Sequence, residues 1–354
     1  MKALVFHEPR HIAVEDVPDP AAGPGEVVLD VSAAAICHSD IRVYLGQKHA
    51  HAGVIPGHEI AGVVAAAGEG VRGLAAGDRV VVCPIVACGS CVYCRSGRRQ
   101  RCPERRTLGY DENGGLAQRV LLPAALVSLG HVLAVPAGLS MQRACLTEPL
   151  ACVLNSLERC GLAAGQSLAV VGAGPMGLLH VLLARRLGAG PIIVSEMDEA
   201  RAEAARRLGA TAVVNPKRQD FVSAVREHSE GIGADAVVMT AGLADALEQS
   251  LAAVRPQGVI NLFAGFPPNT SLALDVNVIH YREIRLTGSQ NASPEQYARL
   301  LQLLPQMPEV DTITTHRFPL AEATEAYAVR LRNEGLKSMV VMSGDPQADG
   351  QAEA

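Results

Sequence analysis

Short apolar runs, repeatedly interrupted by glycine and proline, fill the first 150 residues of the chain. Four of these runs are Val27–Val31, Ile60–Ala66, Arg79–Val82 and Gln118–Leu122. Runs of this length that are bounded by turn-forming residues are typical of β-strands. The pattern therefore predicts an all-β domain of short strands over residues 1–149.

After Gly165 the pattern changes, and apolar runs alternate with helix-like stretches. The apolar runs are Leu168–Val171, Ile192–Val194, Ala212–Val214, Ala236–Met239, Val259–Phe263 and Ile284–Gly288. The helix-like stretches between them include Glu199–Leu208, Phe221–Glu227 and Ala244–Val254. Strand–helix alternation at this spacing indicates βαβ units and a parallel sheet. The predicted fold class is therefore α/β, with a doubly wound parallel sheet over residues 150–289.

Composition narrows the class of protein without indicating its chemistry. Hydrophobic residues make up 49% and charged residues 19% of the 354 residues, which excludes a disordered chain. The length exceeds that of one ordinary core, so two domains are expected. A net charge of −5 argues against binding to nucleic acid or to an anionic membrane, because both require a basic surface.

The sequence contains no segment that we interpret as a membrane span or a signal peptide. Glycines and a proline interrupt the longest apolar stretch, Ser167–Ala184, and Glu8 and Arg10 break the run at the amino terminus. We therefore expect a cytoplasmic protein. In that compartment its nine cysteines would serve a metal or catalysis rather than disulfides.

Four of the cysteines form a compact C-x2-C-x2-C-x7-C pattern: Cys88, Cys91, Cys94 and Cys102. Four thiolates can surround one zinc ion tetrahedrally at about 2.3 Å, which leaves no position for water or substrate. The pattern predicts a structural zinc lobe at about residues 84–106. An iron–sulfur cluster is the alternative, since some ferredoxins use similar spacing. Zinc is favoured because nothing else in the chain suggests electron transfer.

A second group of potential ligands lies outside this lobe. Cys37 precedes His58 and Glu59 by some twenty residues, and Glu148 stands just before the α/β region. Cysteine, histidine and carboxylate are the ligand types of a catalytic zinc, which keeps one position open. Asp40 is a candidate partner that would fix the orientation of the His58 ring.

A glycine motif follows the first strand of the predicted parallel sheet. Gly172, Gly174 and Gly177 give G-x-G-x-x-G, the spacing that lets a backbone turn approach a pyrophosphate at a helix start. Glu196 follows the next predicted strand, where an acidic residue can bind the adenosine ribose diol and repel a 2′-phosphate. The sequence therefore predicts NAD rather than NADP.

In this order, the β domain, the four-cysteine lobe, the open site and the glycine motif closely resemble the zinc-dependent medium-chain dehydrogenase/reductase family. Gly77-Asp78-Arg79-Val80 and Arg255-Pro256-Gln257-Gly258 extend the resemblance over nearly the whole chain. The resemblance implies a GroES-like catalytic domain over residues 1–149 and a Rossmann NAD-binding domain over 150–289. Residues 290–354 would return to the catalytic domain and end in a frayed tail. We also expect a homo-oligomer, either a dimer or a tetramer.

Within the family, Gly57-His58-Glu59 and Glu148-Pro149-Leu150 look like the polyol (sorbitol/L-iditol) and threonine dehydrogenase branch. This resemblance implies that Cys37, His58 and Glu59 hold the catalytic zinc, with Glu148 as a ligand or as the partner of a water. It places Ser39 in a proton relay, with Glu59 or Glu148 holding the next acceptor. The remaining cofactor contacts that we predict are His38, Pro175, Met176 and Arg201.

Three positions depart from the usual pattern of relatives. His38 stands where the polyol branch has glycine, and Thr240 where an acidic or small residue usually follows the fourth Rossmann strand. Arg42 lies where many relatives keep a relay histidine. None of these three positions is a predicted zinc ligand or part of the glycine motif.

The predicted reaction is oxidation of a secondary alcohol of a polyol or sugar alcohol by NAD+, giving a ketose. It would use two zinc ions per chain and a small-molecule substrate. The alternative enzyme is an L-threonine or other amino-alcohol dehydrogenase. The non-enzyme alternative is a catalytically silent NAD-binding structural protein.

Overall fold

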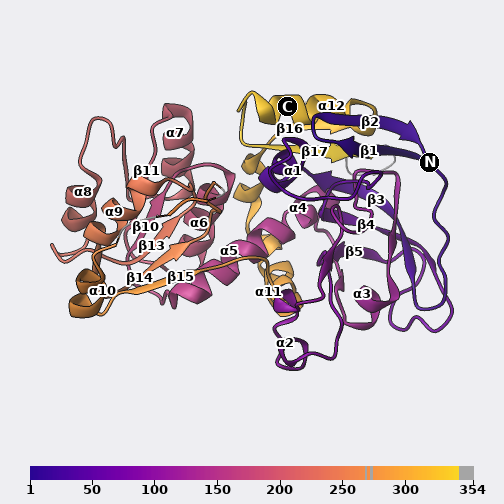
Figure 1. Ribbon diagram of the computed structural model, residues 1–354, viewed down its shortest axis with the longest axis horizontal. Helices are drawn as coiled ribbons and strands as arrows, with labels where there is room; N and C mark the ends of the chain where they lie inside the picture. The colour runs from indigo at the N-terminus through magenta and orange to yellow at the C-terminus, as the bar shows by residue number, and fades with distance from the viewer. Residues whose placement is uncertain (268, 272–273, 343–354) are drawn as a thin grey trace. The chain divides into compact units, whose positions relative to one another are not determined.

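A computed structural model describes residues 1–267, 269–271 and 274–342 (Figure 1). The chain divides into two compact units. The first contains Met1–Ala151 and the segment from Ala292 onward, and the second contains Cys152–Asn291. The predicted frayed tail lies outside the described residues. Within the described ranges, no helix combines the length and the apolar character needed to cross a bilayer.

The first unit is built on a seven-stranded sheet in which β3 is central. The path through the sheet is β16 (Thr314–Pro319), β17 (Lys337–Val341), β3 (Val27–Ala35), β4 (Glu59–Ala67), β5 (Arg79–Val82) and β9 (Val132–Ala134), and β8 (Arg119–Leu122) pairs with β3 off this path. Two small sheets pair β1 (Lys2–Glu8) with β2 (His11–Asp16), and β6 (Ile85–Val86) with β7 (Arg106–Thr107). The late strands β16 and β17 thus share one sheet with the early strands β3 and β4.

The four apolar runs of the first unit coincide with β3, β4, β5 and β8, and the unit also contains short helices. These helices are α1 (His38–Tyr44), α2 (Val92–Arg95), α3 (Ala124–Ser128), α4 (Met141–Cys145), α11 (Pro294–Leu303) and α12 (Ala323–Leu331). In α1, the backbone N–H of Cys37 donates to the Asp40 carboxylate, a local bond that starts the helix without an apolar periodicity. Figure 1 shows α12 beside the N-terminal strand β2, and the two elements are in contact.

The second unit is a six-stranded parallel sheet with helices around it (Figure 1). Its strand order is β12 (Ala212–Val214), β11 (Ile192–Ser195), β10 (Leu168–Val171), β13 (Ala234–Met239), β14 (Val254–Leu262) and β15 (Arg285–Gly288). In order of appearance this is 3-2-1-4-5-6, the doubly wound arrangement whose ligands bind where the order reverses. The predicted α/β class and doubly wound sheet are confirmed.

The helices of the second unit follow the predicted alternation closely. They are α6 (Pro175–Arg186), α7 (Glu199–Leu208), α8 (Phe221–Glu227), α9 (Ala244–Ala253) and α10 (Val276–Arg282), while α5 (Thr147–Cys160) runs across the boundary between the units in the sequence. Residues of β10 are fully buried, as expected for a central parallel strand covered on both faces. One difference concerns Arg255–Gly258, which lies inside β14, where the pairing with β13 shifts register.

Candidate functional site

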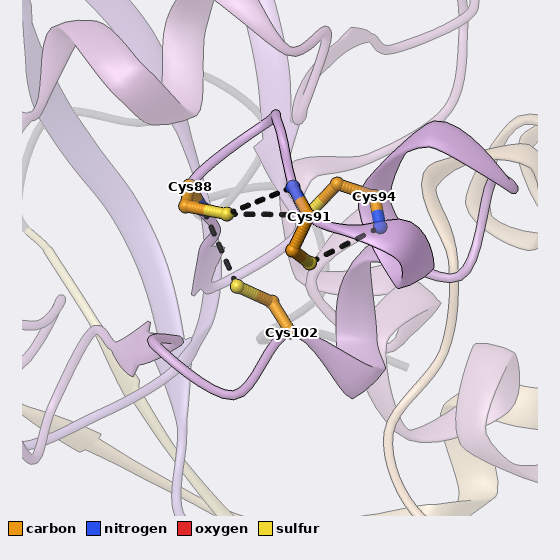
Figure 2. Close-up of side chains that lie close together, drawn as sticks. All are labelled: Cys88, Cys91, Cys94 and Cys102. Carbon is orange, nitrogen blue, oxygen red and sulfur yellow. Dashed lines mark hydrogen bonds between the residues drawn. The ribbon is translucent and has the colours of Figure 1, made fainter.

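The four cysteines of the lobe converge on one point, as Figure 2 shows. Their sulfur atoms all lie within 4.8 Å of one another, and those of Cys88 and Cys94 are 3.9 Å apart. Two sulfurs bound to one zinc at about 2.3 Å with a tetrahedral angle would be about 3.8 Å apart, whereas a disulfide would bring them to about 2.05 Å. The geometry therefore fits a shared metal ion, and no disulfide joins any of the nine cysteines.

Backbone N–H groups point at the sulfurs of the lobe, which favours thiolates. The amide of Cys91 donates to Sγ of Cys88 over 3.4 Å, and that of Cys94 donates to Sγ of Cys91 over 3.5 Å (Figure 2). Hydrogen bonds from the backbone of Ser90 and Cys91 lower the pKa of the Cys88 thiol to about 6, whereas burial raises the pKa of the Cys94 thiol to about 12. Because zinc binds the thiolate form, these donors fit the chemistry of a four-cysteine zinc site.

The second ligand group is assembled by the pairing of β3 with β4. Ala35 at the end of β3 lies opposite Glu59 at the start of β4, and Cys37 follows β3 by two residues. This register brings the ligand atoms of Cys37, His58 and Glu59 within 4.8 Å of one another. His58 and Glu59 are buried, whereas Cys37 is partly exposed. The set therefore has the donor types of a catalytic zinc site with one side accessible.

Gly57 makes the turn that delivers His58 and Glu59 to this point. Its φ is +93°, in the left-handed region, and a Cβ there would lie 2.8 Å from Cγ of Leu116. Only glycine satisfies both conditions without strain or a clash. The backbone turn at Gly57 thus determines where the side chains of His58 and Glu59 lie.

Asp40 holds the ring of His58 as the sequence predicted. Its Oδ1 lies 3.1 Å from Nδ1 of His58, and its Oδ2 accepts the backbone N–H of Cys37. When Nδ1–H donates to Asp40, Nε2 keeps its lone pair for a metal. Burial alone would lower the pKa of His58, but attraction to Asp40 and Cys37 outweighs it and holds that pKa well above its ordinary value.

Sequence reasoning missed Tyr110, which joins Ser39 to His58. Its hydroxyl lies 2.7 Å from Oγ of Ser39 and 3.0 Å from Nδ1 of His58. The ring is buried, and Nζ of Lys48 lies 3.5 Å from its centroid. No spacing in the sequence links Tyr110 to Ser39, because the contact spans 71 positions and depends on the loop after β7.

Lys337 is the second residue that sequence reasoning missed. Its Nζ donates to Oε1 of Glu59 over 2.7 Å, although it lies 278 positions further along the chain. Burial raises the pKa of Glu59 to about 7, against the attraction of Lys337. Burial alone would lower the pKa of Lys337, but its attraction to Glu59 raises it. The candidate metal site thus contains a buried cation beside one of its ligands.

The other predicted residues of the first unit lie in different surroundings. Glu148 is buried in the first turn of α5 and raises the pKa of Glu59, but it does not belong to the three-residue ligand group. His38 is exposed at the start of α1, and Arg42 lies in the last turn of the same helix. The structure therefore brings together three of the four predicted catalytic ligands as one metal-binding group.

The glycine motif forms a tight turn between β10 and α6. A Cβ on Gly177 would lie 2.0 Å from the carbonyl oxygen of Gly172, so the turn requires glycine there. A Cβ on Gly174 would meet nothing within 4 Å, so this glycine leaves space beside the N-terminus of α6, which begins at Pro175 and Met176. Such space above free N–H groups at a helix start fits a phosphate.

Glu196 and Thr240 both contact this turn. Oε2 of Glu196 accepts the backbone N–H of Ala173 over 2.7 Å, which places the carboxylate at the end of β11 beside the glycine motif. The hydroxyl of Thr240 donates to the carbonyls of Val171 and Gly172 over 2.9 Å each, so this departure from the usual residue stabilises the turn. Arg201 lies in the first turn of α7, where its backbone N–H donates to Asp198.

Both units of the chain are similar to domains of known proteins. Residues 23–131 match the alcohol dehydrogenase GroES-like domain, and residues 175–306 match the zinc-binding dehydrogenase domain. The chain is 33% identical to the sorbitol dehydrogenase of Bacillus subtilis (strain 168) over 348 residues, which cover 96% of this chain and 97% of that protein. It is 34% identical to the L-threonine 3-dehydrogenase of Pyrococcus furiosus over 327 residues, which cover 90% and 91% of the two chains.

The fold is also similar to that of a solved structure. It is a putative zinc-binding dehydrogenase from Sinorhizobium meliloti 1021 bound to NADP, with a TM-score of 0.89 and 30% sequence identity. The similarity covers 96% of this chain and 98% of that one.

Proposed function

The chain belongs to the zinc-dependent alcohol dehydrogenase family, and from this premise we propose that it oxidises a secondary alcohol of a polyol with NAD+. The observation that carries the proposal is the Cys37, His58 and Glu59 group. Two of these ligands are anionic, which makes a bound zinc a weaker Lewis acid than one cysteine with two neutral histidines would. Such a centre suits a substrate that chelates through two neighbouring oxygens, as a vicinal diol does.

Each residue around the group has a role in this reaction. Zinc, when bound, would act as a Lewis acid that lowers the pKa of the substrate hydroxyl. Ser39 would take the hydroxyl proton, and Tyr110 would hold Ser39 through their 2.7 Å hydrogen bond. Asp40 would keep the His58 ring in its ligating orientation. The alcohol carbon then gives a hydride to NAD+, so the products are a ketone, NADH and one proton.

The second unit would bind the nucleotide. The backbone N–H groups at the start of α6 would hold the pyrophosphate, and Glu196 would accept hydrogen bonds from the adenosine ribose. We retain His38 and Arg201 as predicted cofactor contacts. Glu148 stays a proposed ligand or water partner. The dimeric or tetrameric state and the cytoplasmic location also stay predictions.

The experiment that tests the substrate is a screen of NAD+ reduction over polyols, L-threonine, amino-sugar alcohols and simple alcohols. We expect the fastest reduction with a polyol that has a vicinal diol. L-Threonine is the second candidate, because it can chelate through oxygen and nitrogen and because a threonine dehydrogenase is among the similar proteins. Turnover with primary or benzylic alcohols and with no polyol would contradict the substrate and leave the family unchanged.

Measuring the zinc content distinguishes an active enzyme from a catalytically silent NAD-binding protein. We expect two zinc ions per chain, one in the four-cysteine lobe and one at Cys37, His58 and Glu59. A single zinc would mean that only the lobe is occupied, and the protein would then be a binding protein rather than a complete enzyme.

Replacing Glu196 with alanine is expected to weaken NAD+ binding and to relax the rejection of NADP+. Losing charge-assisted hydrogen bonds typically costs about 1.5–3 kcal/mol, or roughly ten- to a hundredfold in affinity. The measurement is KM for NAD+ and for NADP+ in wild type and variant. Glu199→Ala is the matched control, since it removes a carboxylate on α7 that pairs with Arg206 instead of the glycine turn. A wild-type enzyme that prefers NADP+ would refute the assignment of Glu196.

A further inference from the structure

The ion pair between Lys337 and Glu59 is closed to solvent. The side chain of Lys337 is 4% exposed, that of Glu59 is 0% exposed, and the two charged atoms are 2.7 Å apart. Removing two charges from water is costly, so a buried ion pair does not by itself make a protein more stable. We therefore looked for a role of this ion pair other than stabilising the fold.

Three adjacent strands bring the pair together beside the ligand group. Lys337 begins β17, and β17 pairs with β3 in the same sheet in which β3 pairs with β4. The backbone N–H of Ile36 donates to Ser338, and Ala35 lies opposite Glu59. Lys337 Nζ also lies 3.5 Å from the carbonyl oxygen of Ile36, the residue before Cys37. The lysine is thus held by two contacts, one with Glu59 at the start of β4 and one with the segment between β3 and Cys37.

The two oxygens of the Glu59 carboxylate have different surroundings. Oε1 accepts the short hydrogen bond from Lys337. Oε2 is buried and has no hydrogen-bond partner among the described residues. A buried anionic oxygen without a partner is costly, which points to a cation that binds there. Because Glu59 belongs to the group with Cys37 and His58, Oε2 is the oxygen available to that cation.

We propose that Lys337 restricts Glu59 to a single metal-binding oxygen, Oε2, and so keeps a coordination position open for the substrate. A carboxylate can bind a metal through one oxygen or through both. With Cys37 and His58 as the other ligands, a second oxygen from Glu59 would take the fourth position of a tetrahedral site. The charge-assisted hydrogen bond from Lys337 competes for Oε1 and prevents this. Lys337 is a positioning residue, and its role rests on the proposed metal site but not on the identity of the substrate.

The test replaces zinc with Co2+, whose visible absorption depends on its coordination number and ligands. We compare wild type with Lys337→Met, which keeps an unbranched side chain but removes the charge and the donor. Wild type should give the strong absorption of a four-coordinate site. The variant should give a shifted band, because Oε1 of Glu59 takes the position that is open to water in wild type, together with a several-fold loss of turnover at unchanged NAD+ affinity.

Three further variants isolate the effect. The spectrum of His58→Ala contains only the cobalt of the four-cysteine lobe and is subtracted from the others. Arg143→Met removes a partly buried positive charge that pairs with Asp311 instead of Glu59, so its spectrum should match wild type. Lys337→Arg keeps a charged donor and should retain the wild-type spectrum. If Lys337→Met does not fold, Lys337→Gln removes the charge and is expected to show the same shifted band.

Two results would overturn the proposal. The first is an unchanged cobalt spectrum in Lys337→Met or Lys337→Gln at full metal content, which would leave the metal site intact and refute only the role of Lys337. The second is wild-type protein that binds cobalt in the four-cysteine lobe alone, which would refute the catalytic metal site and this inference with it. The two failures are therefore distinguishable by the metal content of wild type.

Discussion

Replacing His58 with alanine is expected to abolish turnover while NAD+ still binds. His58 is one of three residues whose ligand atoms converge, and its ring is held by Asp40 for that purpose. Lewis-acid stabilisation of a transition state contributes several kcal/mol, which corresponds to a loss of roughly a thousandfold or more. The glycine motif belongs to the other unit of the chain, so nucleotide affinity should change little.

The measurements for this variant are turnover with the best substrate of the screen, zinc content and NAD+ affinity. Zinc should fall from two ions per chain to one. His131→Ala is the matched control, because His131 is equally buried in the same unit but belongs to neither ligand group. The control should retain both zinc ions in its folded fraction. Full turnover in His58→Ala would show that the catalytic ligands have been misassigned.

Replacing Cys94 with serine is expected to destabilise the protein instead of acting on the chemical step. Cys94 is one of four sulfurs that surround a single point, and a closed shell of this kind contributes folding energy directly. Loss of a structural metal is one of the few single changes that cost about 4 kcal/mol or more. The free energy of unfolding, measured with denaturant, should fall by that order, and zinc should fall to one ion per chain.

Cys83→Ser is the control for this experiment. Cys83 is buried in the same unit, near the lobe in sequence, but lies outside the four-sulfur group. The control should keep both zinc ions. A Cys94→Ser protein with normal stability and no turnover would mean that the lobe has a catalytic role.

The elements that the sequence predicted best belong to the second unit, whose central strands β10 and β11 are buried on both faces. The strands of the second unit, and helices such as α7 and α8, lie where periodicity placed them, because burial in a parallel sheet depends mainly on local pattern. The helix α1 was not predicted. It begins through the hydrogen bond between Cys37 and Asp40, which produces no hydrophobic period.

Some residues of the candidate sites were predicted from the sequence and others were not. The four cysteines and the glycine motif were found because their spacing along the chain reflects their geometry in space. Tyr110 and Lys337 were missed because their contacts with Ser39 and Glu59 span 71 and 278 positions. The first contact depends on the loop after β7, and the second depends on the register of β17, β3 and β4, which is decided by the packing of the whole sheet.

The position of β17 affects the order in which the protein can be completed during synthesis. Residues 152–291 form one continuous stretch, so the second unit can fold as soon as it leaves the ribosome. The first unit cannot, because β3 and β4 are made early and β17, which pairs with β3, is the last of the described strands. Until Lys337 emerges, the carboxylate of Glu59 lacks its buried ion-pair partner. The nascent chain therefore carries an unfinished metal site throughout the synthesis of its nucleotide-binding half.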